Sequence, residues 1–399
     1  MATHPLQTNG YARIGYRLVN YLANYYDVIY YGFSNYDLDV VKRPIHKNIQ
    51  IIDALRENST QDPFGYEIFK DQVRKHSPDI IIIYNDLLVT CNFLNRINEL
   101  RSSGEFTGKV VNYIDLVYDF EDPEYINFCA KWCDMLLVFS EHWKQNLLDM
   151  NVNTRIEILP HGFDEEQFFE VEKFAAREAF GGLNQEDFII LNNNRNSYRK
   201  AHDIIIAAFL QFLKRVDFDP TVKLFIHCDI ANDYGYDIRK IVALECVKQK
   251  VNTDLIMNNH ILITPKNRMN DEQMNFLYNS CDVGVNSCVG EGFGLCNLEH
   301  MALGKPQIVS RVGGLKDIFI HYPEFTVEPV AELTISRHID AHIGVIKICR
   351  SQDFTDKLYK IYTNRNLYNN WAQNCRQYVR GFYDWSKINS HLVKVLKSL

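Results

Sequence analysis

Two glutamates, Glu291 and Glu299, bracket a glycine-rich stretch that reads Glu-Gly-Phe-Gly-Leu from residue 291 to residue 295. A short helical pattern starts at Leu295, which puts Glu291 in a loop and Glu299 about one turn into a helix whose side chains lean toward its N-terminus. Carboxylates accept hydrogen bonds from sugar hydroxyls, whereas a glycine-rich helix N-terminus suits a phosphate. The stretch therefore predicts a site for a ligand that carries both groups.

Three cations earlier in the chain form a second candidate group. Arg195, Arg199 and Lys200 follow an apolar run over residues 188–191 and precede a helical pattern over residues 202–214. Cations held in place favour the negative charge that grows on a leaving diphosphate. A solvated basic loop is the alternative interpretation, but the two glutamates and the glycine-rich stretch favour a functional one.

Other candidates have more evenly balanced interpretations. Asp115 directly follows the apolar run 110–114, where parallel strands gather site residues, although an aspartate there can also cap a loop. His161 lies at the predicted domain junction and is interpreted as structural. Tyr278 either borders a nucleobase pocket or belongs to the core, since it is at helical spacing from Met274.

These residues must be positioned by strands and helices that alternate along the whole chain. Such alternation predicts parallel sheets covered on both faces, and two series of strands predict two doubly wound domains with ligands at the carboxyl ends of the strands. The expected strands are 28–33, 49–52, 79–84, 109–114, 135–140 and 155–159, followed by 188–191, 222–227, 261–264, 283–286 and 307–309.

The predicted boundary divides the chain into residues 1–163 and residues 164–384, with a last amphipathic helix over residues 385–399. A strand should precede the glycine loop at Asn9 and Gly10, but only residues 1–6 are available and Pro5 is among them. We expect either a very short first strand or a chain that begins downstream of its natural start.

Composition narrows the class of protein. The 399 residues exceed one average domain, and 46% of them are hydrophobic, enough for packed cores. A net charge of −7 argues against a nucleic-acid-binding protein. No apolar run is long enough to span a membrane and the N-terminus lacks signal-peptide features, so we expect a cytoplasmic protein. The ten scattered cysteines fit reduced, buried thiols.

Four elements in order resemble retaining glycosyltransferases of family 4, which have the GT-B fold. They are the glycine loop at residues 8–12, the segment Leu-Pro-His-Gly-Phe-Asp at 159–164, the Arg195 to Lys200 loop, and the intact glutamate motif from Glu291 to Glu299. The amino-acid sequences of the last two elements are most similar to those of glycosyltransferases encoded by large DNA viruses. This resemblance would place the protein in the host-cell cytoplasm.

The resemblance implies two Rossmann-like domains that face each other across a cleft. The first would hold the acceptor, the second would hold a nucleotide-diphosphate sugar, and the last helix would pack back on the first. The implied reaction is metal-independent, retaining hexosyl transfer to a glycan or other hydroxyl acceptor, without a cofactor and with GDP-mannose favoured as donor. The implied catalytic residues are Glu291, Arg195, Lys200 and Asp115, and the implied donor-binding residues are Asn9, Gly10, Arg199, Gly292, Phe293, Gly294, Leu295 and Glu299.

Three alternatives stay open at this stage. A degenerate transferase would bind the nucleotide sugar without transferring it, and a nucleotide-sugar epimerase or a phosphorylase could share the fold. A fourth alternative is rejected: Asp37-Leu38-Asp39 matches the Asp-x-Asp of metal-dependent transferases, but so short a match is common by chance, and no catalytic metal is expected. The acceptor, the linkage and the oligomeric state cannot be derived from the sequence.

Overall fold

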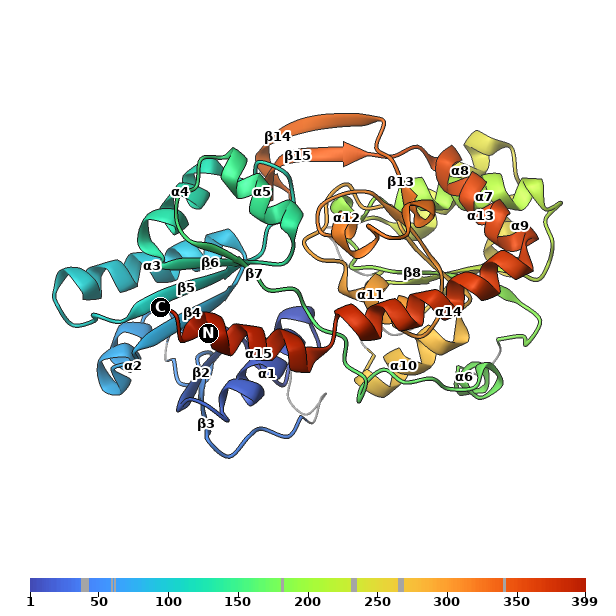
Figure 1. The fold of residues 1–399 in the computed structure, drawn as a ribbon. Helices are drawn as coiled ribbons and strands as arrows, with labels where there is room; N and C mark the ends of the chain where they lie inside the picture. Colours follow the sequence, from blue (N-terminus) through green and yellow to red (C-terminus); the bar gives the residue numbers. More distant parts are fainter. Residues whose placement is uncertain are drawn as a thin grey trace. The chain divides into compact units, whose positions relative to one another are not determined.

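The computed structural model describes residues 1–36, 43–58, 60, 62–180, 183–230, 235–264, 269–339 and 342–399. The chain divides into two compact units, the first formed by Met1–Gly162 and Trp385–Leu399 and the second by Phe163–Asp384. Each unit has parallel strands with helices packed around them (Figure 1). The predicted fold class of two doubly wound parallel-sheet domains is confirmed.

The first unit alternates strands and helices and ends with the last helix of the chain. Its elements are β1 (Ala2–Thr3), α1 (Gly10–Leu22), β2 (Val28–Phe33), β3 (Ile49–Asp53), α2 (Phe69–His76), β4 (Ile80–Asn85), α3 (Leu87–Ser102), β5 (Lys109–Ile114), α4 (Pro123–Trp132), β6 (Met135–Val138), α5 (Glu141–Asp149), β7 (Ile156–Ile158) and α15 (Trp385–Leu396).

The two-residue strand β1 lies between the two sheets of this unit. The strands β1-β2-β3 form one parallel sheet and β4-β5-β6-β7 another. Met1 connects them, because its amino group donates to the carbonyl of Ile82 and its own carbonyl accepts from the amide of Tyr84. Strand β1 is thus the central strand at which the order reverses, and α1 starts from its carboxyl end.

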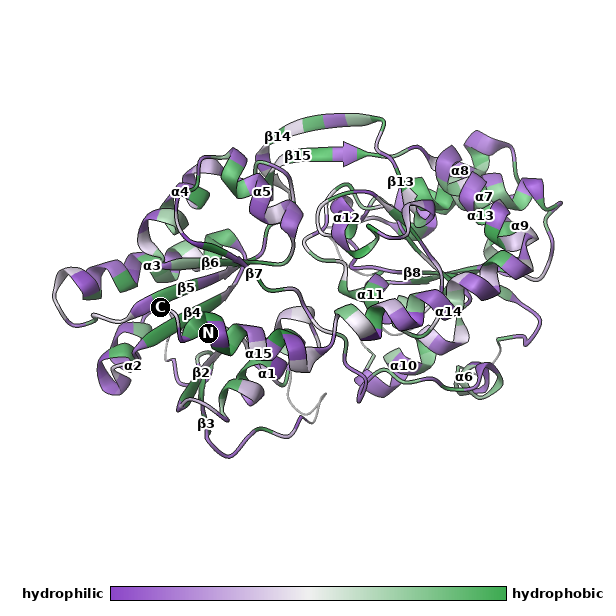
Figure 2. Ribbon diagram, viewed as in Figure 1, coloured by the Kyte–Doolittle hydropathy of each residue, from purple (hydrophilic) through white to green (hydrophobic). Residues whose placement is uncertain are grey.

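Apolar strands form the centre of the first unit. Figure 2 shows β4 and β5 as largely hydrophobic bands between helices that turn polar faces outward. Such continuous apolar runs are typical of parallel strands buried on both faces. Helix α15 packs on α1, where the hydroxyls of Tyr21 and Ser390 lie 2.9 Å apart and Leu392 is buried.

The second unit holds the remaining elements. They are α6 (Lys173–Ala179), β8 (Phe188–Asn193), η1 (Tyr198–Lys200), α7 (His202–Arg215), β9 (Val222–His227), α8 (Ile238–Gln249), α9 (Thr253–Asn259), β10 (Ile261–Ile263), α10 (Asp271–Ser280), β11 (Val283–Asn286), α11 (Leu295–Ala302), β12 (Gln307–Ser310), α12 (Leu315–Ile318), η2 (Pro323–Phe325), β13 (Thr326–Val327), β14 (Ala331–Ile339), β15 (His342–Ile348), α13 (Ser351–Thr363) and α14 (Arg365–Phe382).

Six strands of the second unit form one parallel sheet in the order β10-β9-β8-β11-β12-β13. The order reverses between β8 and β11, which are hydrogen-bonded neighbours although two strands separate them in the sequence. In a doubly wound sheet, ligands bind outside the carboxyl ends of the strands at such a reversal point. The loops that follow β8 and β11 therefore position the candidate site.

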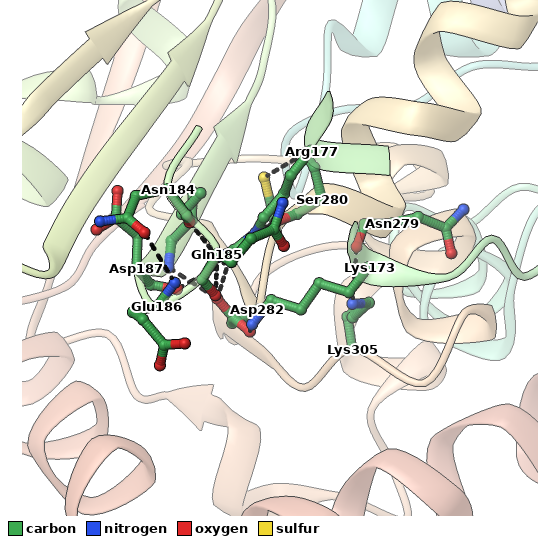
Figure 3. A network of polar contacts seen from close by, with 12 residues as sticks. Lys173, Arg177, Asn184, Gln185, Glu186, Asp187, Asn279, Ser280, Asp282 and Lys305 are labelled. Atoms are coloured by element: carbon green, nitrogen blue, oxygen red, sulfur yellow. Dashed lines mark hydrogen bonds and ion pairs between the residues drawn. The ribbon is translucent and has the colours of Figure 1, made fainter. Parts of the chain in front are cut away.

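A buried ion pair joins the amino ends of the same two strands to α6 (Figure 3). Arg177 is fully buried, and its guanidinium donates to Oδ2 of Asp282 at 2.9 Å and to four backbone carbonyls. Oδ2 of Asp282 also accepts from the amide of Ile189 at 2.9 Å, and its Oδ1 lies 2.6 Å from Nζ of Lys173. This network stabilises the amino-terminal ends of β8 and β11, whereas the candidate site lies at their carboxyl ends.

Strands β14 and β15 form a separate antiparallel hairpin. The amide of Lys347 in β15 donates to the carbonyl of Val289, so the hairpin contacts the loop that follows β11. Within the described residues, no helix is both long enough and apolar enough to cross a lipid bilayer.

Candidate active site

Hydrogen bonds connect two loops of the second unit at the carboxyl ends of β8 and β11. The amide of Val289 donates to the carbonyl of Arg199 at 2.9 Å, and the hydroxyl of Ser287 donates to the carbonyl of Ala201 at 2.8 Å. Nη1 of Arg199 donates to the carbonyl of Gly290, also at 2.8 Å. These bonds bring the basic loop beside the first glutamate.

The fastened loops place two cations against one carboxylate. Nζ of Lys200 donates a hydrogen bond to Oε2 of Glu291, and Nη1 of Arg199 lies 3.7 Å from the same oxygen. The exposed fractions of the three side chains are only 9% for Lys200, 13% for Arg199 and 12% for Glu291. A cluster so poorly hydrated interacts more strongly than the same charges would at the surface.

The charges of this cluster determine the ionisation of Glu291. Burial raises the pKa of its carboxyl, but Lys200 and Arg199 outweigh burial, and the net pKa lies below its usual range. Glu291 is therefore a carboxylate at neutral pH. It can accept hydrogen bonds from hydroxyl groups, while the two cations can attract a phosphate.

Arg195 does not join this cluster. Its side chain is exposed, and among the described residues it makes no hydrogen bond or ion pair. Its carbonyl accepts from Nε2 of His202 at 3.3 Å, which fixes the backbone of the loop. The two arginines therefore have different roles. Arg199 connects the two loops, and Arg195 is exposed to solvent.

Asparagines that the sequence analysis did not single out shape the same loop. Asn196 is fully buried; its Nδ2 donates to the carbonyls of Asp229 and Tyr236, and its Oδ1 accepts from the amide of Tyr236. Asn192 shares a 3.1 Å hydrogen bond with Nδ1 of His202. The run of asparagines was a visible signal, because a polar side chain directly after a buried strand needs a specific partner.

The glycine-rich loop depends on close backbone packing. Gly294 has a φ of 102° and precedes the first turn of α11, in a conformation that glycine adopts without strain. A Cβ on Gly314 would lie 2.3 Å from the carbonyl of Gly292 and 2.9 Å from Cα of Phe293. The amide of Gly314 donates to the carbonyl of Glu291. This packing fixes the turn that presents Leu295 and the N-terminus of α11.

Glu299 lies on α11 and is 3% exposed. Its Oε2 accepts a 2.9 Å hydrogen bond from the hydroxyl of Tyr278, which itself accepts one of 2.9 Å from Nδ2 of Asn193. Tyr278 is 1% exposed, so it belongs to the core and also contacts the second glutamate of the motif. Of the two interpretations of Tyr278, the place in the core is confirmed, and the border of a nucleobase pocket stays a prediction.

A buried polar chain connects the surroundings of the two glutamates. Nδ2 of Asn286 donates to Oδ1 of Asn297, whose Nδ2 donates to Oε1 of Gln307. Nε2 of Gln307 contacts Nδ1 of His300 at 3.1 Å, and Nε2 of His300 contacts the carbonyl of Tyr278 at 3.1 Å. A carbonyl only accepts, so His300 donates there and accepts from Gln307, as a neutral ring does. Burial lowers the pKa of His300 well below 6.5, in agreement.

The remaining predicted residues belong to the first unit. Asn9 caps α1, its Oδ1 accepting from the amide of Ala12 at 2.9 Å, and Gly10 is the first residue of that helix. Asp115 directly follows β5 and accepts a hydrogen bond from the hydroxyl of Tyr11. Burial and then the charge of Asp115 raise the pKa of Tyr11 well above its usual range, so Tyr11 is a donor at neutral pH.

His161 is buried among aromatic rings of the first unit. Its Nε2 lies 3.2 Å from the hydroxyl of Tyr84, and burial lowers its pKa to about 3. Asp37-Leu38-Asp39, the metal-site alternative, lies outside the described residues. In the part of the chain that is described, no group of three or more histidine, cysteine, aspartate or glutamate side chains has the arrangement of a metal site.

Known proteins share both the sequence pattern and the fold. The sequence model of the family described as "Glycosyl transferases group 1" matches residues 174–378. Mannosylfructose-phosphate synthase of Agrobacterium fabrum is 27% identical over 163 residues, which is 40% of this chain and 33% of that protein. The chain spans about a third of the length of the curated relatives it matches.

Solved glycosyltransferase structures have the same two-domain GT-B fold. Sucrose-phosphate synthase from Thermosynechococcus elongatus superposes with a TM-score of 0.72 at 18% identity, covering 97% of this chain and 92% of that one. Anabaena HepE in complex with UDP and glucose gives a TM-score of 0.69 at 14% identity, covering 99% of this chain and 97% of that one. At these identities the likeness extends to the fold alone.

Proposed function

Because this chain belongs to the family of group 1 glycosyl transferases, we propose that it transfers a hexosyl group from a nucleotide-diphosphate sugar to a hydroxyl acceptor. One observation carries the proposal. Lys200 and Arg199 meet Glu291 where the sheet order reverses between β8 and β11, beside the N-terminus of α11. That arrangement combines the two kinds of group that a sugar diphosphate requires.

The diphosphate is assigned to the positive part of this arrangement. Lys200 and the exposed guanidinium of Arg195 supply cations, and the N-terminus of α11 at Leu295 supplies backbone amides. Negative charge on the β-phosphate grows as its bond to the sugar breaks, so these groups stabilise the transition state more than the bound donor. Glu291 is assigned to the hydroxyls of the transferred sugar, and Glu299 to those of the ribose.

The proposed reaction retains the configuration of the anomeric carbon. The bond between this carbon and the β-phosphate oxygen breaks while the acceptor oxygen bonds from the same face. The acceptor proton passes to the leaving phosphate, so no protein nucleophile is required. In the first unit, Asp115 is the carboxylate proposed to bind the acceptor hydroxyl, and the start of α1 at Gly10 is proposed to bind phosphate. Exclusion of water would protect the donor from hydrolysis.

Two observations point to different donors. The viral resemblance of the sequence favours GDP-mannose, whereas the HepE structure contains UDP and glucose. We propose GDP-mannose as the first donor to test and UDP-glucose as its competitor. The transfer is proposed to need neither a metal ion nor another cofactor.

Product analysis tests the proposal. The purified protein is incubated with GDP-mannose or UDP-glucose and a panel of sugar and sugar-phosphate acceptors, and release of nucleoside diphosphate is measured with and without EDTA. We expect acceptor-dependent release that EDTA leaves unchanged, with an α-linked product by NMR from either α-linked donor. Binding without release, in wild type and under all acceptor conditions, would instead identify a degenerate nucleotide-sugar-binding protein.

A further inference from the structure

A three-residue relay runs from the end of strand β8 to the second glutamate of the site. Asn193, the last residue of β8, donates through Nδ2 to the hydroxyl of Tyr278 on α10 at 2.9 Å. That hydroxyl donates to Oε2 of Glu299 on α11, also at 2.9 Å. Three elements that are distant in the sequence thus converge on one carboxylate oxygen.

The chemistry of the donors sets the direction of the relay. Nδ2 of Asn193 can only donate, so it engages a lone pair of the Tyr278 oxygen and leaves the hydroxyl proton for Glu299. A buried carboxyl oxygen without a hydrogen-bond donor is costly, so the hydroxyl of Tyr278 stabilises the carboxyl group of Glu299. Tyr278 therefore holds Oε2 of Glu299 in one position.

Packing immobilises the ring that carries this hydroxyl. His300 stacks on Tyr278 with ring centroids 5.3 Å apart and planes 21° apart, and Nε2 of His300 donates to the carbonyl of Tyr278. Phe168 contacts the ring with a centroid distance of 5.4 Å. At 1% exposure, the tyrosine is positioned to hold Glu299 and not to contact a ligand itself.

We propose that Tyr278 is the positioning residue that orients Glu299 for the ribose hydroxyls of the nucleotide, an inference that rests on the function proposed above. Through this hydrogen bond Tyr278 restricts the orientation of the carboxylate that is proposed to accept from the ribose hydroxyls. Loss of the phenolic hydroxyl would remove this hydrogen bond to Oε2 of Glu299, and recognition of ribose would weaken while the phosphate contacts remain.

The test compares ribonucleotide with deoxynucleotide in matched variants. Dissociation constants of the nucleoside diphosphate that wild type prefers, GDP or UDP, and of its 2′-deoxy form are measured by calorimetry for wild type, Tyr278→Phe and Glu299→Gln. We expect wild type to prefer the ribonucleotide by about tenfold or more. Tyr278→Phe should lose most of that preference by weakening ribonucleotide binding, with little change for the deoxy form.

Tyr362→Phe is the matched control, because the hydroxyl of Tyr362 donates to Oδ2 of Asp219 at 2.6 Å and removing it is the same chemical change elsewhere in the unit. It should keep the wild-type preference. If Tyr278→Phe does not fold, Asn193→Ala removes the first donor of the relay and should lower the preference in the same direction, by a smaller factor.

The outcomes separate the inference from the proposed function. A folded Tyr278→Phe variant that retains the full wild-type preference would show that the tyrosine only packs, and so would an unchanged preference in Asn193→Ala. A wild type that binds nucleoside diphosphate without preferring the ribo form would remove the ribose role of Glu299 and with it the inference. A wild type that binds no nucleoside diphosphate would overturn the proposed function as well.

Discussion

Lys200 and Glu291 lie on different loops of the second unit, and their side chains form a hydrogen-bonded ion pair that is about nine-tenths buried. Removal of one partner leaves the other charge poorly solvated, which for a buried pair costs about 3 kcal/mol or more. The pair therefore supports the loop structure as well as the proposed chemistry.

The first prediction separates these two contributions. Lys200→Met and Glu291→Gln should each lower kcat/KM by about 100-fold or more, and the double variant should lose much less than the product of the two effects. Steady-state kinetics of the four proteins form the double-mutant cycle. Lys248→Met is the control, since Lys248 pairs with Glu245 but is 68% exposed, and it should leave kcat/KM unchanged.

The second prediction distinguishes the two arginines of the basic loop. Arg195→Ala should lower kcat/KM by about 100-fold with an unchanged melting temperature, because its exposed side chain makes no hydrogen bond or ion pair among the described residues. Arg199→Ala should lower both quantities, because its guanidinium fastens the loops through Gly290 and Glu291. Equal melting temperatures for the two variants would contradict this division of roles.

The third prediction concerns the backbone of the glycine-rich loop. Gly314→Ala should destabilise the protein by about 1–3 kcal/mol and weaken donor binding, because its Cβ would lie 2.3 Å from the carbonyl of Gly292. Gly381→Ala is the control on α14, where a Cβ meets no atom within 4 Å, and it should be neutral or slightly stabilising. Urea unfolding and a nucleotide titration measure the two effects.

The fourth prediction follows from four buried histidines. Burial lowers the pKa of His161 to about 3 and of His202 and His227 to about 4, and that of His300 well below 6.5. Below the unfolded pKa of about 6.5, the unfolded chain binds protons that the folded protein does not. These histidines therefore leave the free energy of unfolding at its full value above about pH 6.5. The free energy of unfolding decreases as the pH falls from there toward the pKa values of the histidines in the folded protein, by up to about 1.4 kcal/mol per pH unit for each histidine.

Urea unfolding between about pH 7.5 and about pH 5 measures this loss. The folded protein should be markedly less stable at the acidic end. A free energy of unfolding that stays constant over this interval would mean that these rings take up protons in the folded state.

Much of the fold could be predicted because local patterns determine it. Strands β5 and β9 begin and end at the predicted residues, since apolar runs bounded by turns are an unambiguous signal of buried parallel strands. The hairpin β14–β15 was not predicted. Most described side chains of β14 are exposed, and an exposed two-stranded ribbon leaves little hydrophobic pattern to read.

The candidate site was only partly predictable, for a different reason. Two short segments predicted these residues, the glutamate motif for Glu291 and Glu299 and the basic loop for Lys200, because glycines and charges at fixed spacing are visible in each. The partners of these residues are distant in the sequence: Asn193 and Tyr278 reach Glu299 only after β8 and α10 pack beside α11. Such contacts depend on the order of the strands, which no local pattern determines.

The measurement that tests the central claim most directly is the thermal stability of the wild-type protein with GDP-, UDP-, ADP- and TDP-sugars, with and without EDTA. A ligand at ~100 times its Kd should stabilise the folded protein by about 2.7 kcal/mol. We predict selective stabilisation by one nucleotide family, unchanged by EDTA and greatly reduced in the Lys200→Met variant. The absence of a shift with every nucleotide sugar would contradict the assignment of this site to a sugar-nucleotide donor.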